Sequence, residues 1–133
     1  TSYMFNPFVK YKGLELFGTI EVASGGNKKG MDEKRTINQY AGDVVYRFGA
    51  NENFYLGARY NVVSGKLANA DAKEVSIDRL EASAGWFMTK NILTKLAYVN
   101  QNYNDYSVLS GVNPNDLYGG NFKGLMFEAV ITF

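Results

Sequence analysis

The residue types that most often carry out chemistry are either missing from this chain or lack the partners they need. The sequence contains no histidine and no cysteine. A Ser-His-Asp triad is therefore excluded, as are thiolate metal sites and the commonest zinc ligands. Glu15 with Glu21, or Asp78 with Glu81, would offer the carboxylate pair of a glycosidase. Ion pairing is the better interpretation of these carboxylates, and we predict no enzyme activity, no catalytic residue, no metal site and no cofactor.

Two loop motifs could bind ions but are incomplete. The stretch Gly-Gly-Asn-Lys-Lys-Gly at 25–30 lacks the Walker spacing, and no apolar helix follows it. Asp105, Asn113, Asn115 and Asp116 supply oxygen atoms of the kind that calcium prefers, but a solvated loop is the default interpretation. The net charge is only +1, which gives no electrostatic case for nucleic acid as a partner.

Composition favours strands and turns over helices. Aromatic residues make up 15% of the chain, with 14 glycines and two prolines. No run of about 18 apolar residues occurs, so a transmembrane helix is not expected. The first residues, Thr-Ser-Tyr-Met-Phe, lack the organisation of a signal peptide, so we expect an exported protein to be represented by its mature form or by a fragment.

The elements that would position the polar residues are β-strands. Apolar and polar residues alternate with a period of two, as expected when successive side chains point to opposite faces of a sheet. This pattern predicts an all-β fold of about seven antiparallel, up-and-down strands. The predicted strands cover residues 5–12, 14–23, 37–48, 54–64, 79–88, 92–101 and 121–133. The start of the fifth is uncertain, because Val75 and Ile77 have the opposite parity and suggest a bulge or a raised loop end.

Charged residues gather on one face of these strands. A tight turn at Lys12-Gly13 would place Lys10 opposite Glu15, with glycine supplying a positive φ. A turn at 49–53 would likewise place Asp43 opposite Arg59. The face shared by the charged residues contains Lys10, Glu15, Glu21, Asp43, Arg47, Arg59, Arg79, Glu81, Lys95 and Glu128.

The connections between the predicted strands alternate between short and long. Short turns on one rim and long loops on the other are typical of outer-membrane β-barrels. A charge that faces lipid near the bilayer midplane costs about 2–4 kcal/mol, whereas a charge in a wet lumen costs little. We therefore predict a transmembrane barrel with its apolar face toward lipid and its charged face toward the lumen. The inverted arrangement, a soluble ligand-binding β-barrel with an apolar core, remains an alternative.

The terminal strand, 121–133, resembles the C-terminal signal of bacterial outer-membrane β-barrel proteins. In that family the chain ends in phenylalanine after apolar residues at alternate positions. The matching residues here are Leu125, Phe127, Ala129, Ile131 and Phe133. The resemblance implies an outer-membrane location, with the barrel assembly machinery and the lipid bilayer as partners.

Two further segments resemble the porin-like outer-membrane proteins of Bacteroidota, which are distantly similar to phosphate-selective porins. These segments are Phe-Asn-Pro-Phe-Val-Lys-Tyr-Lys-Gly-Leu-Glu-Leu-Phe-Gly at 5–18 and Ala-Tyr-Val-Asn-Gln at 97–101. The resemblance implies a barrel of well over a dozen strands. An odd number of strands would place the chain ends on opposite rims. Residues 1–133 are therefore expected to be the C-terminal, closing part of a larger barrel domain; the alternative is that one strand at the N-terminus is missing or misread. The balance of basic and acidic residues on the charged face argues against phosphate selectivity.

The expected function is passive diffusion of small polar or ionic solutes through an outer-membrane channel. The alternative in a membrane is a structural or docking barrel that belongs to a larger outer-membrane assembly. The sequence does not determine the transported solute, the oligomeric state, the total number of strands or whether the pore is open or plugged. Assembly into a homo-oligomer or a larger outer-membrane complex is a further alternative.

Overall fold

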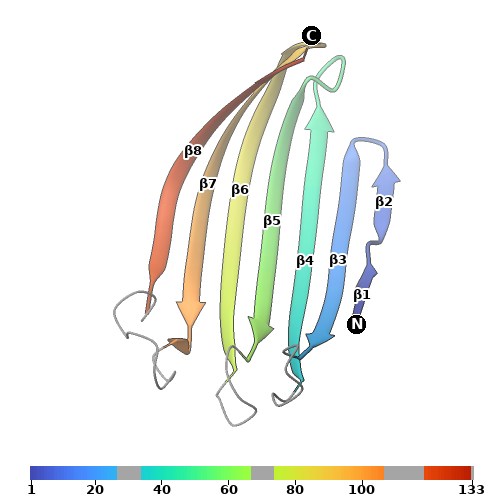
Figure 1. Cartoon of the computed structure of the whole chain (residues 1–133). Helices are drawn as coiled ribbons and strands as arrows, with labels where there is room; N and C mark the ends of the chain where they lie inside the picture. The colour runs from blue at the N-terminus through green and yellow to red at the C-terminus, as the bar shows by residue number, and fades with distance from the viewer. Residues whose placement is uncertain (27–33, 67–73, 107–118, 133) are drawn as a thin grey trace.

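A computed structural model describes residues 1–26, 34–66, 74–106 and 119–132 (Figure 1). These residues form one antiparallel sheet of eight strands, and no α-helix occurs among them. The strands are β1 (Ser2–Phe5), β2 (Phe8–Tyr11), β3 (Leu14–Gly25), β4 (Arg35–Phe48), β5 (Phe54–Gly65), β6 (Val75–Thr89), β7 (Ile92–Asn104) and β8 (Asn121–Ile131). From β3 to β8 each strand pairs with the next one in sequence, and both β1 and β2 pair with β3. The predicted all-β, up-and-down arrangement is confirmed, but the sheet is not closed into a barrel.

The two predicted turn registers are confirmed. Lys10 lies opposite Glu15 across the first turn, and Asp43 lies opposite Arg59 across the second. The source of the positive φ in the first turn was predicted wrongly, because Lys12 adopts it (52°) and Gly13 does not. Gly13 is required for another reason: a Cβ there would lie 2.3 Å from the carbonyl oxygen of Arg47 on β4.

The first predicted strand is divided in two by Pro7. Proline has no N–H to donate to a ladder, so it interrupts the pairing on this edge of the sheet. Its carbonyl still accepts a hydrogen bond from the Gly18 N–H at 2.9 Å, which keeps β1 and β2 beside the same neighbour. Strand β6 also differs from the prediction, because it begins at Val75 without a bulge. Val75 and Ile77 pair in register with β5, and the irregularity lies at the other end, between Phe87 and Thr89.

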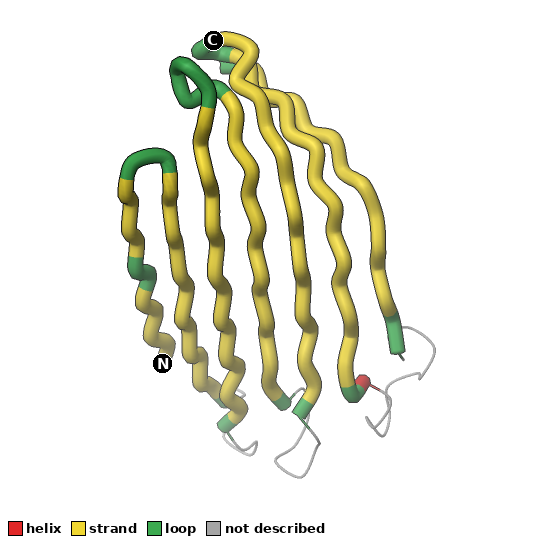
Figure 2. The backbone as a smooth tube through the Cα atoms, turned by 180° about the vertical axis from the view of Figure 1, so that it is seen from behind, coloured by secondary structure: helices red, strands yellow, loops and turns green. Residues whose placement is uncertain are grey.

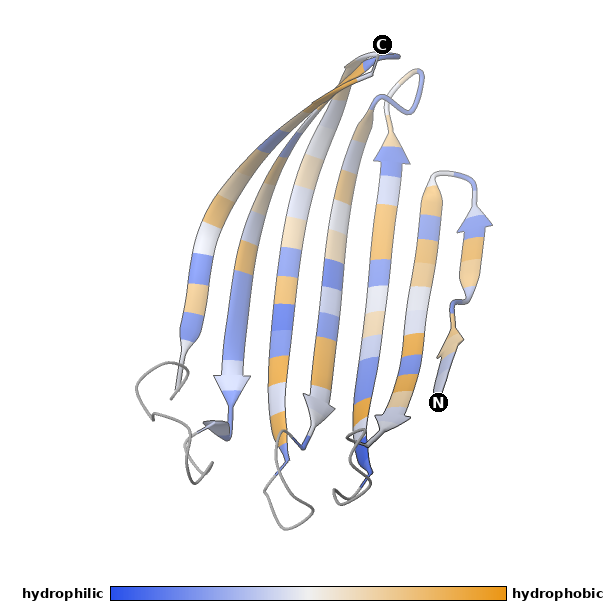
Figure 3. Ribbon diagram, in the orientation of Figure 1, coloured by the Kyte–Doolittle hydropathy of each residue, from blue (hydrophilic) through white to orange (hydrophobic). Residues whose placement is uncertain are grey.

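The two faces of the sheet differ in polarity and in enclosure. The sheet is curved (Figures 1 and 2), and hydrophobic and hydrophilic residues are interspersed along its strands (Figure 3). Among the described residues, the buried hydrophobic side chains are Val75, Ala97 and Val99, which all share the face of the charged residues. In a single curved sheet only the concave side encloses side chains, so the charged face is the concave face.

The convex face is apolar and uncovered. Leu125 and Phe127 on β8 are 75% and 70% exposed, and Leu56 on β5 is 54% exposed. The described residues contain no helix with the length and apolar content needed to cross a membrane.

The chain ends lie at opposite ends of the sheet (Figure 1). Strands β1 and β2 form one edge, β8 forms the other, and all three run from the end with the long connections toward the end with the short turns. The strands at the two edges of the sheet therefore run in the same direction.

Candidate functional site

The candidate site is the concave face, where the strand registers bring together all ten charged residues predicted to share one side. Nine of them form ion pairs with one another, and we call these nine residues the charged belt. The belt consists of Lys10, Glu15, Asp43, Arg47, Arg59, Arg79, Glu81, Lys95 and Glu128. Glu21 lies on the same face and makes no ion pair with any described residue.

Two groups within the belt are closely paired. Glu15 Oε1 accepts hydrogen bonds from Lys10 Nζ at 3.0 Å and from Arg47 Nε at 3.1 Å. Glu81 accepts from Lys95 Nζ at 2.7 Å and from Arg79 Nη2 at 3.3 Å. These bonds join strands β2 to β4 in the first group and β6 to β7 in the second.

Two pairs are looser. Lys95 Nζ lies 3.9 Å from Glu128 Oε2 on β8. Arg59 Nη1 lies 3.6 Å from Asp43 Oδ1, which is beyond hydrogen-bonding distance. The other carboxylate oxygen, Asp43 Oδ2, is buried and has no hydrogen-bond partner among the residues that the structure describes.

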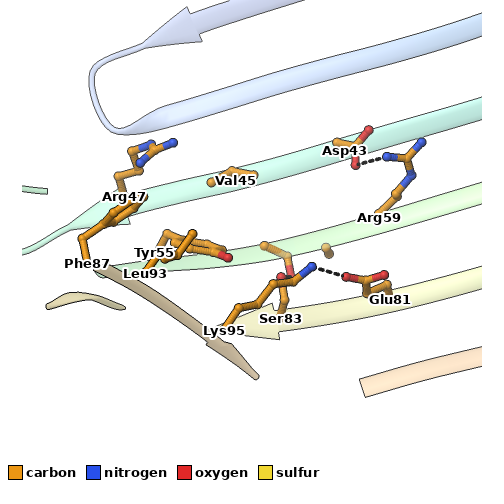
Figure 4. A pocket seen from close by; sticks show the side chains of 12 residues that line it. Asp43, Val45, Arg47, Tyr55, Arg59, Glu81, Ser83, Phe87, Leu93 and Lys95 are labelled. Atoms are coloured by element: carbon orange, nitrogen blue, oxygen red, sulfur yellow. Dashed lines mark hydrogen bonds and ion pairs between the residues drawn. The ribbon is translucent and has the colours of Figure 1, made fainter. Parts of the chain in front are cut away.

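The Asp43–Arg59 pair lies in a pocket of about 380 Å³ on the concave face (Figure 4). Charged, polar and apolar side chains from four strands contribute to its lining. Its lining includes Asp43, Val45, Arg47, Tyr55, Arg59, Glu81, Ser83, Phe87, Leu93 and Lys95.

The end of the pocket nearest the short turns is built around the Tyr55 ring. A Cβ on Gly85 would lie 2.0 Å from this ring, so the absence of a side chain at Gly85 lets the ring lie against the neighbouring strand. Phe87 packs beside it with ring centroids 6.2 Å apart, and the Arg47 guanidinium lies 5.4 Å from the Phe87 centroid. This cation–π contact adds to the ion pair in fixing Arg47.

The carboxylate pairs that were considered for catalysis are not brought together in the structure. The carboxylates of Glu15 and Glu81 are each held between two basic groups. Glu15 and Glu21 are not joined to each other, and Asp78 lies on the opposite face from Glu81 because their positions differ by an odd number of residues. Among the described residues, no group of three or more potential metal-ligating side chains gathers in one place.

The candidate ion-binding loops lie mostly outside the described residues. This holds for residues 27–30 of the glycine-rich stretch and for Asn113, Asn115 and Asp116. Tyr103 and Tyr106, beside the third long connection, pack edge to face with centroids 5.8 Å apart. Burial raises the pKa of the Tyr106 phenol, and Tyr103 adds to the effect.

The predicted assembly signal lies on the convex face of β8. Leu125, Phe127 and Ile131 are 75%, 70% and 60% exposed, and Ala129 shares their parity. Phe133 lies outside the described residues.

Sequence reasoning missed the apolar and hydroxyl residues of the pocket. Val45, Tyr55, Ser83 and Leu93 have the same parity as the charged residues on their strands, and this signal could have identified them. A search for charge alone passes over them.

A scan against protein families, a search of curated proteins and a search of solved structures found no match for this chain.

Proposed function

We propose that this chain forms part of the wall of a bacterial outer-membrane β-barrel that lets small polar or ionic solutes diffuse passively. The observation that carries the proposal is the shape of the apolar area on the convex face. A soluble protein rarely leaves a large continuous apolar surface in water. Lipid is the covering that suits a surface running across every strand.

The boundary of this apolar area toward the long connections is sharp. From β3 to β8, the last apolar residue on the convex face is followed, two positions nearer the long connection, by a polar one. The last apolar residues are Val22, Tyr40, Val62, Leu80, Tyr98 and Leu125, and the polar residues beyond them are Ser24, Asn38, Ser64, Asp78, Asn100 and Lys123.

This boundary crosses the strands obliquely. Strand β4 serves as the reference for height. On β3 the boundary lies at Val22, which pairs with Asn38 of β4. On β8 it lies at Leu125, which the successive strand registers place level with Val44 of β4. The shift from Asn38 to Val44 is six residues, or about 20 Å at about 3.3 Å per residue. The five steps from β3 to β8 cover about 24 Å at about 4.8 Å each. The boundary is therefore inclined by about 40° to the direction perpendicular to the strands. Strands of outer-membrane barrels tilt by about 35–45°, so a boundary level with the membrane plane would have this slope.

The length of the apolar area along a strand and the aromatic rings at its rim also support insertion into a bilayer. On β5 it extends from Phe54 to Val62, which agrees with the roughly 9–11 residues that a tilted membrane strand needs. At the end with the short turns, the rings of Tyr46, Phe48, Phe54 and Trp86 stack in a row with centroids 5.8–6.2 Å apart. A row of aromatic rings at this height is typical of the interfacial girdle of a barrel.

The charged belt supports a water-filled lumen on the other side. Charged groups and partly exposed ion pairs are stable where water reaches them and costly in a dry interior. Closing the sheet with antiparallel pairs requires an odd number of further strands, because its two edges run in the same direction. We propose that these strands belong to a longer porin-like barrel.

Two adjacent valines on β4 provide the test. Val44 lies near the middle of the apolar area and is 40% exposed, whereas Val45 lines the concave pocket. Cysteine at position 44, and likewise at Leu56, Ala84 and Leu96, should react with a membrane-restricted maleimide in lipid vesicles. Cysteine at position 45 should react with a water-soluble one.

The same preparation in planar bilayers should conduct ions. Aqueous labelling at position 44 would refute membrane insertion and favour the soluble barrel. Membrane labelling at position 44 without any conductance would refute the channel and favour the docking barrel.

A further inference from the structure

Of the two looser pairs in the charged belt, Asp43–Arg59 is the one that lines the pocket, and it has unused hydrogen-bonding capacity. The four closest belt pairs have N–O distances of 2.7–3.3 Å, whereas Asp43 and Arg59 are 3.6 Å apart. Among the described residues, Asp43 Oδ2 has no hydrogen-bond partner, and the Arg59 side chain is 47% exposed. Because Asp43 lines the pocket and its carboxylate lacks a donor, the pocket is suited to a ligand that supplies one.

The charges around the gap favour a ligand that carries both signs. Arg59 is flanked by Asp43 on β4 and by Glu81 on β6. A simple anion at Arg59 would be repelled by both carboxylates, and a simple cation at Asp43 would be repelled by Arg59. A ligand with an ammonium and a carboxylate a few bonds apart would complement both groups.

The rest of the pocket is suited to a hydrocarbon group. Val45, Tyr55 and Leu93 line it on the side of the short turns from the Asp43–Arg59 pair (Figure 4). A volume of about 380 Å³ falls within the range of about 300–1,000 Å³ that is usual for small-molecule pockets.

We infer that this pocket binds a small zwitterion of the amino-acid class. The ligand's ammonium group donates to the Asp43 carboxylate, its carboxylate accepts from the Arg59 guanidinium, and its apolar side chain packs toward Tyr55 and Leu93. The inference rests on the proposed function, because it requires a concave face open to dissolved solutes. It adds a substrate class that the charged belt alone does not specify.

Calorimetric titration of the protein folded in detergent micelles tests the inference without relying on conductance. The probe is L-leucine, compared with N-acetyl-L-leucine, which lacks the ammonium, and with L-leucinamide, which lacks the carboxylate. We expect leucine to bind and each analogue to bind at least tenfold more weakly. Asp43→Asn and Arg59→Gln should each weaken leucine binding at least tenfold.

Two matched variants serve as controls, with folding checked by heat-dependent gel mobility. Arg35→Gln removes an arginine from the same face of β4, and Glu21→Gln removes a carboxylate from that face of β3; neither residue lines the pocket or belongs to the charged belt. Both should bind leucine as the parent protein does. Equal binding of leucine and N-acetyl-leucine would show that the pocket recognises a simple anion and not a zwitterion, and would overturn the inference. A conducting protein that binds no leucine would also overturn it while leaving the proposed channel intact.

Discussion

At the scale of single residues, the charged belt contains five basic and four acidic groups and is unevenly paired. Glu15 and Glu81 each hold two basic groups at hydrogen-bonding distance, whereas Arg59 has one distant partner. Exposed ion pairs contribute only about 0–1 kcal/mol to stability. Arg59 is therefore the basic group of the belt whose charge is most available to a passing ion.

Replacing Arg59 with glutamate should shift the ion preference of the proposed channel toward cations. The substitution changes the local charge by two units beside Asp43 and Glu81, in a confined space where fields are less screened than at an open surface. Reversal potentials in a salt gradient across a planar bilayer measure the shift. The stability cost should stay below about 1 kcal/mol, because water reaches the site.

The matched variant Lys10→Glu changes the charge by the same amount outside the pocket. It should shift the reversal potential less, because Lys10 is already bonded to Glu15 at 3.0 Å. Equal shifts for the two variants would show that the belt acts only through its net charge.

At the scale of elements, β8 combines an exposed apolar face with the edge of the sheet. Within the described part of the chain, each strand from β3 to β7 has a neighbour on both sides, whereas β8 pairs only with β7. An unpaired strand edge is costly in hydrocarbon, because its backbone groups find no water there. An assembly factor that binds this strand would cover both its edge and its apolar side chains.

Phe133→Asp should therefore reduce assembly more than any single loop substitution. The physical reason is that a charge replaces the aromatic ring predicted to end the recognised strand at the membrane interface. The measurement is the yield of heat-resistant folded barrel in the outer membrane. Thr132→Asp places the same charge on the adjacent residue and should have the smaller effect; an undiminished yield for Phe133→Asp would contradict the prediction.

At the scale of the whole molecule, the oblique apolar boundary fixes how the sheet would lie in a bilayer. The six-residue shift from β3 to β8 and the strand spacing give a slope of about 40°. No single strand contains this information, because the slope appears only when the registers are known.

The strands should tilt by about 35–45° from the normal of an oriented bilayer. Polarised infrared spectroscopy of the amide I band measures this angle directly. A mean tilt below about 20°, or a protein that does not enter the bilayer, would be inconsistent with the proposed orientation.

The sequence alone determined the strands, the two short-turn registers and which residues share a face. These features are local, because alternation has a period of two and a tight turn fixes the pairing on either side of it. The register of Lys10 with Glu15 and of Asp43 with Arg59 followed directly from turn length.

Only the tertiary structure determined the break at Pro7, the regular start of β6 and the contents of the pocket. Pro7 could have ended a strand or interrupted one, and the choice depends on its continued bond to Gly18 of β3. Val75 has an apolar side chain on a mostly polar face, where it pairs with Gly65 of β5 and is buried. The loose Asp43–Arg59 pair and the Tyr55 ring over Gly85 depend on how side chains from neighbouring strands fill a concave surface, which no pattern along a single strand specifies.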